Sequence, residues 1–163
     1  MTTQHQRGEL ASLMDYLIGQ EPRVHYGQIR PMPTAHIKNL VQLHQEIVSP
    51  KGVTMDCSES VTLICRLAGL RDPNGLGYNG DGNTETMLGH LRHYYNPGSA
   101  GVGALVVFGV GRLSTEHVCM VRRTGSDPML FSHGQERGPI YLPLSVERKY
   151  HVPPYTFLSI AAL

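Results

Sequence analysis

Residues 55–68 read MDCSESVTLICRLA and are the stretch that decides the fold. Apolar side chains recur there at helical spacing, at Val61, Ile64, Cys65 and Ala68. Asp56 is a residue type that favours a helix N-cap, and Gly69 is typical of a helix end. The stretch therefore predicts a helix that begins at Asp56, ends near Ala68 and carries Cys57 in its first turn.

The position of Cys57 leaves two interpretations open. The first turn of a helix carries a partial positive charge and unpaired N–H groups, which stabilise a thiolate, and the thiolate is the nucleophilic form of cysteine. Free cysteines are also common as small buried apolar residues, which is the structural alternative. Position alone does not choose between a nucleophile and a packing residue.

The rest of the chain changes character after Gly101. Before it, the spacing of apolar residues predicts helices at residues 8–19, 37–48, 56–68 and 84–95. After it, short segments rich in β-forming residues predict strands at 104–110, 117–122, 129–132 and 155–161. Helices followed by an antiparallel sheet indicate an α+β fold. The segment 71–83 is rich in Gly and Asn, and two interpretations stay open. It borders a substrate groove or partner surface, where Tyr78 is the one large side chain that could contact a ligand, or it is a plain surface connection.

Composition limits the classes of protein that fit. The chain has 163 residues, which suits one domain, and 14 basic against 13 acidic residues, which argues against a nucleic-acid partner. Three cysteines are too few for a disulfide framework. The apolar stretch 102–110 is too short to cross a bilayer, and residues 1–12, MTTQHQRGELAS, lack the pattern of a secretory signal. We therefore expect a soluble single-domain protein with no signal peptide and no membrane insertion.

A nucleophilic cysteine needs a base, and the predicted hairpin offers one. His117 begins one strand and His133 follows the next, with the turn at residues 124–128 midway between them. An antiparallel hairpin closed at that turn sets the two histidines opposite each other on one face, where His133 can orient the His117 ring. Two surface histidines near strand ends are the structural alternative.

Four motifs in order resemble the NlpC family of papain-like cell-wall cysteine peptidases. They are Asp-Cys-Ser at 56–58, Gly-Ala-Leu-Val-Val-Phe at 103–108, Glu-His-Val at 116–118 and Phe-Ser-His at 131–133. The resemblance implies a single papain-like domain over residues 1–163, with N-terminal helices packed on an antiparallel sheet. Within it, residues 1–20 form an N-terminal helix, 24–133 the motif-bearing core and 134–163 a C-terminal extension that completes the sheet.

Carried over by motif, the resemblance implies roles for particular residues. Cys57 is the expected nucleophile, His117 the base and His133 the group that orients the base. Tyr26 matches the tyrosine that precedes the nucleophile in this family, and it is assigned with Asp56 and Ser58 to substrate and oxyanion binding. The implied activity is cleavage of an amide bond in peptidoglycan stem peptides, without a cofactor.

The chain also departs from the family pattern. Glu59 stands where the family has Gly, Ala104 stands where it has Asp, and Tyr26-Gly27 is only part of the usual tyrosine motif. The compact motif at 132–136 and the missing signal resemble bacteriophage members, so we expect a phage enzyme of lysis or of the virion, located in the virion or in the host cytoplasm before lysis. The alternative is a virion structural or assembly protein of the tail or connector, which uses the fold with little activity and contacts other virion proteins.

Metal sites are weaker hypotheses. His90 and His93 lie at i, i+3, and His117 with Cys119 faces one side of a strand, where zinc is an option together with His133 or Cys57. No Cys-x-x-Cys or His-Glu-x-x-His motif accompanies these residues, and the segment 77–83 lacks the glutamate of a calcium loop. The sequence therefore predicts no metal.

Overall fold

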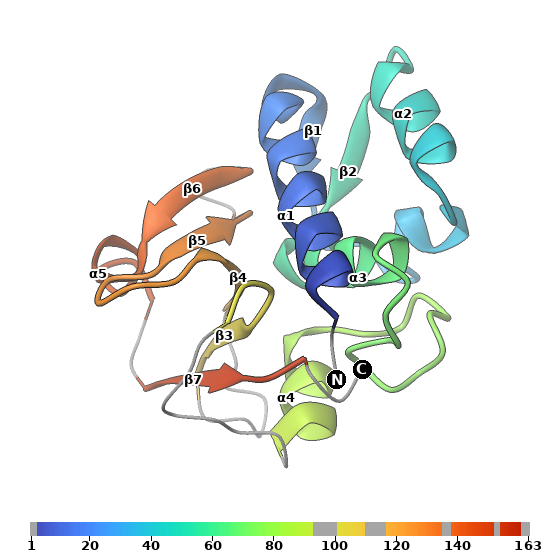
Figure 1. Cartoon of the computed structure of the whole chain (residues 1–163). Coiled ribbons are helices and arrows are strands. Elements are labelled where there is room, and N and C mark those ends of the chain that lie inside the picture. Colours follow the sequence, from blue (N-terminus) through green and yellow to red (C-terminus); the bar gives the residue numbers. More distant parts are fainter. Residues whose placement is uncertain (1–2, 93–100, 110–116, 135–137, 152–153, 161–163) are drawn as a thin grey trace.

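The structure is a computed structural model that describes residues 3–92, 101–109, 117–134, 138–151 and 154–160. Its helices are α1 (Gln4–Gly19), α2 (Leu40–Val48), α3 (Cys57–Leu67), α4 (Thr84–Leu91) and α5 (Leu144–Glu147), with 3-10 turns at Glu21–Arg23 and Pro33–His36. Its strands are β1 (Val24–Tyr26), β2 (Val53–Met55), β3 (Leu105–Phe108), β4 (His117–Arg123), β5 (Met129–Ser132), β6 (Ile140–Pro143) and β7 (Tyr155–Leu158). The predicted α+β class is confirmed (Figure 1).

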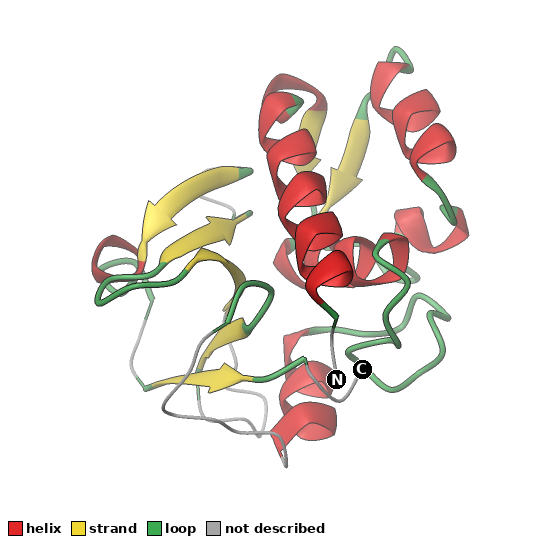
Figure 2. Cartoon of the chain, viewed as in Figure 1, coloured by secondary structure: helices red, strands yellow, loops and turns green. Residues whose placement is uncertain are grey.

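Five strands form one antiparallel sheet in the order β6-β5-β4-β3-β7. A separate parallel pair, β1 and β2, lies on the side of the helices (Figure 2). The C-terminal residues supply β6 and β7, so the edges of the sheet come from the end of the chain. The sequence predicted the strand segments of β3, β4, β5 and β7 but not β1, β2, β6 or α5.

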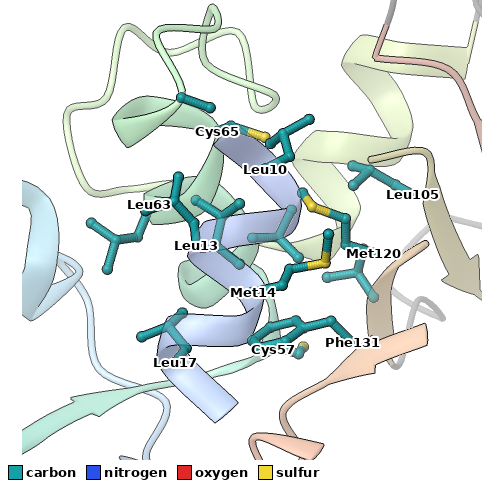
Figure 3. Close-up of a cluster of buried hydrophobic side chains, with 14 of the residues drawn as sticks. Leu10, Leu13, Met14, Leu17, Cys57, Leu63, Cys65, Leu105, Met120 and Phe131 are labelled. Atoms are coloured by element: carbon teal, nitrogen blue, oxygen red, sulfur yellow. The ribbon is translucent and has the colours of Figure 1, made fainter. Parts of the chain in front are cut away.

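The main core lies between the sheet and helices α1 and α3. Figure 3 shows α1 side chains, including Leu13 and Met14, between Leu63 of α3 and strand residues such as Met120. A second apolar layer covers the opposite face of the sheet, where Leu144 of α5 packs over alternate strand residues such as Val106. Because side chains alternate along a strand, each central strand contributes to both layers.

Helix α3 forms where the sequence predicted it, for the predicted reason. Asp56 is the N-cap, and its Oδ1 accepts a hydrogen bond of 2.8 Å from the backbone N–H of Glu59. The helix ends at Leu67, and Gly69 follows in the left-handed region with φ of 70°. Side chains throughout its first two turns are buried, including those of Ser58 and Glu59. No helix among the described residues is long and apolar enough to span a membrane.

The segment between α3 and α4 folds around two buried polar residues. Asp72 accepts hydrogen bonds from the backbone N–H groups of residues 74, 76 and 78, and the Asn74 amide bonds Thr62 of α3. Tyr78 donates to the Leu70 carbonyl, and its ring lies under the Arg66 guanidinium. Tyr78 therefore fastens the loop to α3, and its contact with a ligand stays a prediction. The loop then returns along α3, so that Thr84 lies beside Cys57.

A buried carboxylate also fastens the first turn of α3. Glu59 is wholly buried, and its Oε1 accepts hydrogen bonds from the Thr34 N–H at 2.8 Å and the Thr34 hydroxyl at 2.6 Å. Its Oε2 is buried without a hydrogen-bond partner among the described residues. Burial raises the pKa of Glu59 to about 7, against the lowering effect of the Thr34 hydrogen bonds. Glu59 thus connects α3 to the turn at residues 33–36 through hydrogen bonds.

Replacing Glu59 by Gln should flatten the pH dependence of stability. Between pH 4.5 and about 7 the unfolded carboxyl loses its proton first, so the free energy of unfolding of the native chain falls as the pH rises. The rise in the pKa of Glu59 corresponds to a loss of roughly 3 kcal/mol in the free energy of unfolding across this range. Glu59→Gln stays neutral and can still accept from Thr34, so its stability relative to the native chain should rise across this range. Urea unfolding at pH 5 and pH 8 measures the change, with the exposed Glu21→Gln as control. A difference between Glu59→Gln and the native chain that is independent of pH would contradict the assignment.

Candidate active site

Cys57 lies at a corner of the chain that several polar contacts hold in place. Strand β2 leads directly into Asp56, and α3 begins at Cys57. Arg30 donates through Nη2 to Asp56 Oδ2 at 2.8 Å and to Ser58 Oγ at 2.9 Å, and through Nε to the Gly82 carbonyl at 2.7 Å. Ser58 Oγ in turn donates to Asp56 Oδ1 at 2.8 Å.

These contacts change the expectation for Asp56 and Ser58. Both side chains are buried and bonded to each other and to Arg30. They were assigned to substrate and oxyanion binding, but the structure uses their side chains to fix the start of α3. Their effect on Cys57 is therefore indirect, through the backbone that carries the thiol.

His117, at the start of β4, faces the Cys57 thiol. Burial alone would raise the pKa of Cys57, but the hydrogen bond and charge of His117 outweigh it, and the Val118 N–H lowers the pKa further. The net direction is a lowered pKa. The structure thus brings Cys57 and His117 together, with only 5% and 3% of their surfaces exposed. Figure 3 shows Cys57 beside Phe131 at the edge of the core.

The other side of the His117 ring is held by residues that the sequence analysis missed. His117 Nε2 lies 2.9 Å from Ser132 Oγ and 3.1 Å from Glu147 Oε1. Ser132 Oγ donates to the same carboxylate oxygen at 2.7 Å. Because Nε2 is engaged with Glu147, Nδ1 is the nitrogen that remains for Cys57. A thiol, an imidazole and a buried carboxylate thus lie side by side, with the imidazole between the other two.

The charges in this group support one another. Burial raises the pKa of Glu147, but hydrogen bonds from His117, His151 and Ser132 outweigh it and hold the pKa well below its usual range. Burial would lower the pKa of His117, and Cys119, Cys57 and Glu147 together raise it well above its ordinary value. Burial raises the pKa of Cys119 to about 11, so its thiol is neutral near pH 7. The negative charges that favour imidazolium at neutral pH are therefore those of Glu147 and the Cys57 thiolate.

His133 does not orient His117, contrary to the sequence-based expectation. Its Nε2 lies 3.0 Å from the Met55 carbonyl oxygen and 3.3 Å from that of His25. Its Nδ1 is buried with no hydrogen-bond partner among the described residues. His133 thus ties the end of β5 to β1 and β2, next to the segment that leads into Cys57. Burial is the main cause of its lowered pKa, so the ring favours the neutral form.

The register of the hairpin explains the error. Strands β4 and β5 pair Met120 with Phe131 and Val121 with Leu130, and an irregularity between Val121 and Arg123 shifts the ladder. Continued toward the start of β4, this register sets His133 beside Val118 rather than His117. A shift of one residue moves a side chain to the other face of the sheet. Ser132 takes the position beside His117 that was predicted for His133.

Two further side chains lie near Cys57. Thr84, the first residue of α4, has its Oγ1 3.7 Å from Cys57 Sγ. Tyr26 packs edge-on against the His133 ring at 5.7 Å and accepts a hydrogen bond from Gln28. Burial raises the pKa of Tyr26, with a contribution from the charge of Cys57. Tyr26 therefore lies within electrostatic reach of Cys57, whereas no motif in the sequence pointed to Thr84.

The structure also separates the candidate metal ligands. His117 and Cys119 group with Glu147, and not with His133. Within the described ranges this is the one cluster of His, Cys, Asp or Glu compact enough to hold an ion. The ring of His90 lies against Gly75, and His93 lies outside the described residues.

Comparisons of the chain with protein-family models, curated proteins and solved structures find no match.

Iodoacetamide should alkylate Cys57 at lower pH than the other two thiols. His117 lowers the pKa of Cys57, whereas burial raises that of Cys119 to about 11 and also raises that of Cys65. Mass spectrometry of peptides after timed labelling at several pH values gives the three rates. His117→Ala should move the Cys57 curve to higher pH and leave the Cys65 curve in place. Labelling of Cys65 before Cys57 in the folded protein would count against this assignment.

Proposed function

We propose that the protein is a cysteine hydrolase that cleaves an amide bond. The observation that carries the proposal is a buried row of three side chains in which the Cys57 thiol contacts the His117 imidazole and the imidazole contacts the Glu147 carboxylate. The pKa of the thiol is lowered and that of the imidazole is raised. This pattern favours a thiolate–imidazolium pair, the reactive state of a nucleophilic cysteine. A cysteine that merely fills the core has its pKa raised by burial, as Cys65 does.

The reaction follows from these positions. The Cys57 thiolate attacks the carbonyl carbon of the amide, and the oxyanion that forms is stabilised by backbone N–H groups at the start of α3. The imidazolium of His117 gives its proton to the leaving amine as the C–N bond breaks. His117 then takes a proton from water, which attacks the thioester, releases the acid and restores the Cys57 thiolate beside the His117 imidazolium. Glu147 acts as a positioning residue, since it holds the imidazole and stabilises its charged form.

The substrate class rests on the family resemblance. The Asp-Cys-Ser, Gly-Ala-Leu-Val-Val-Phe, Glu-His-Val and Phe-Ser-His motifs follow the order of the NlpC family, a papain-like group that cuts peptidoglycan peptides. The closeness of Tyr26 to Cys57 and His117 supports the same proposal, because the family carries a tyrosine at that place. We therefore propose stem peptides of peptidoglycan as the substrate and a bacteriophage lysin or virion-associated enzyme as the setting.

One observation favours a second candidate, a virion structural or assembly protein that uses the fold for binding. Helix α2 exposes large apolar side chains at Leu40, Val41 and Val48. Leu40 and Val41 line a groove with Leu13 and Tyr16 of α1. An exposed apolar surface of this kind is a common feature of protein contacts.

Digestion of purified peptidoglycan distinguishes the two candidates. The proposed hydrolase should release new amino and carboxyl termini from stem peptides, and Cys57→Ala should abolish the release. Cys65→Ala, which changes an equally buried thiol on the same helix, is the matched control. An inactive native protein that binds tightly to phage particles would support the structural role instead.

Glu147→Gln should reduce kcat/KM far more than His133→Gln. The first change removes the charge that holds the His117 imidazolium, for which we expect a loss of roughly 10²–10⁴-fold. The second leaves a side chain that can still donate toward the Met55 carbonyl. In Glu147→Gln the Cys57 alkylation curve should also move to higher pH, because a weaker imidazolium stabilises the thiolate less. Equal effects of the two substitutions on rate and on the alkylation curve would refute the positioning role of Glu147.

A further inference from the structure

A second group of reactive side chains lies on the side of His117 that faces Glu147. Glu147 Oε1 is 3.1 Å from His117 Nε2, 3.4 Å from Cys119 Sγ and 3.4 Å from His151 Nε2. His117 and Cys119 are two positions apart on β4, so they share a face, and His151 lies four residues after Glu147 at the end of the chain segment that contains α5. Two elements therefore bring one carboxylate, one thiol and two imidazoles together.

The spacing of the ligand atoms of His117, Cys119 and Glu147 suits a zinc site. Zinc bonds of 2.0–2.3 Å in a tetrahedron place neighbouring ligand atoms about 3.3–3.6 Å apart. The distances from Glu147 Oε1 to His117 Nε2 and Cys119 Sγ are close to this range. The ligand atoms of His117, Cys119 and Glu147 all lie within 4.8 Å of one another, in a group that does not include His151. A set of imidazole, thiolate and carboxylate suits zinc and related soft divalent ions, whereas calcium and magnesium prefer oxygen alone.

A second observation points to an ion at this place. Glu147 is wholly buried, and its Oε2 has no hydrogen-bond partner among the described residues. Buried carboxylate oxygens are rarely left without a partner, and a cation bound by both oxygens of Glu147 supplies one. The rings of His117 and His151 stack at 4.2 Å with an angle of 11°, so both imidazoles present a nitrogen to the same carboxylate. The side chain of His151 is 12% exposed and is the outermost of the four, so an ion can enter there.

We infer that His117, Cys119 and Glu147 form a binding site for Zn²⁺ or a similar divalent ion beside His151, and that a bound ion switches the hydrolase off. Binding removes the Cys119 thiol proton and the Nε2 proton of His117, and both protons pass to solvent. An imidazole with metal on Nε2 carries its remaining proton on Nδ1, so it can no longer accept one there. The inhibitory part of the inference rests on the proposed function, whereas the binding part does not.

Binding is tested without reference to activity, in the Cys57→Ala protein. After treatment with a chelator, this variant should bind one equivalent of Zn²⁺ in calorimetry, and one Co²⁺ with a thiolate-to-cobalt charge-transfer band. Cys57→Ala,Cys119→Ala should lose the band, and Cys57→Ala,Cys65→Ala should keep it. A band that persists without Cys119, or an absence of saturable binding in the Cys57→Ala protein, overturns the site. A band seen only when Cys57 is present places the ion on the Cys57–His117 pair and overturns it too.

His151→Ala provides a second variant, because Cys119 is fully buried and its loss can disturb the core. We expect this change to weaken Zn²⁺ binding more than about tenfold. Zinc should inhibit the native hydrolase, and Cys119→Ala should lose this inhibition because it lacks a ligand. The rate of each protein with zinc is compared with its own rate without metal. Unchanged zinc affinity in a folded His151→Ala protein overturns the placement of the ion beside His151. Binding without any hydrolysis of peptidoglycan leaves the metal site standing and counts against the proposed function alone.

Discussion

The buried carboxylate of Glu147 holds both the Cys57–His117 pair and the group formed with Cys119 and His151. It lies under the sheet on the four-residue helix α5, and it contacts His117, Ser132, Cys119 and His151 through one oxygen. Removing one partner of a buried charged pair is costly, typically about 3–5 kcal/mol, because the other charge then has no compensation. So short a helix has little stability of its own, and we attribute its position to this charge and to the packing of Leu144.

The thiol and the imidazole come from different layers of the fold. Cys57 begins the central helix, whereas His117 begins the central strand of the sheet. Their contact therefore needs both a fixed start to the helix and a fixed sheet. Asp56 and Arg30 hold the first of these, and the hydrogen bond of His133 to the Met55 carbonyl connects the sheet to the strand that leads into the helix. The polar residues around the site thus act chiefly on the backbone.

Local signals in the sequence predicted what local physics controls. The N-cap at Asp56 and the spacing of apolar residues located α3, and the same reasoning placed α4 after Asn83. The start of α1 was missed by four residues, because Thr3 and Gln6 form a capping box that the apolar pattern does not report. Cys57 and His117 could be identified since each lies at the start of an element with a recognisable boundary.

Tertiary contacts decided the rest of the site. The shift between Val121 and Arg123 leaves no sequence signal, yet it replaces His133 by Ser132 beside the base. Glu147 lies in a four-residue helix that no periodic pattern can reveal, and its role depends on the pairing of β6 with β5, which brings it under the sheet. The three-residue strands β1 and β2 are similarly too short to be recognised, since their pairing is parallel and joins segments far apart in the chain.

Glu59 and Glu147 are buried carboxylates whose surroundings give them different charges. Glu59 accepts only from the Thr34 hydroxyl and N–H, which carry no formal charge, and burial raises its pKa to about 7. Glu147 is also buried, but two imidazoles and a hydroxyl face it and keep its pKa low. Carboxyl groups whose surroundings push their pKa values apart can serve different purposes within one site. At neutral pH the charge of Glu147 sustains the imidazolium of His117, whereas the partly protonated Glu59 supports the start of α3 with less than a full charge.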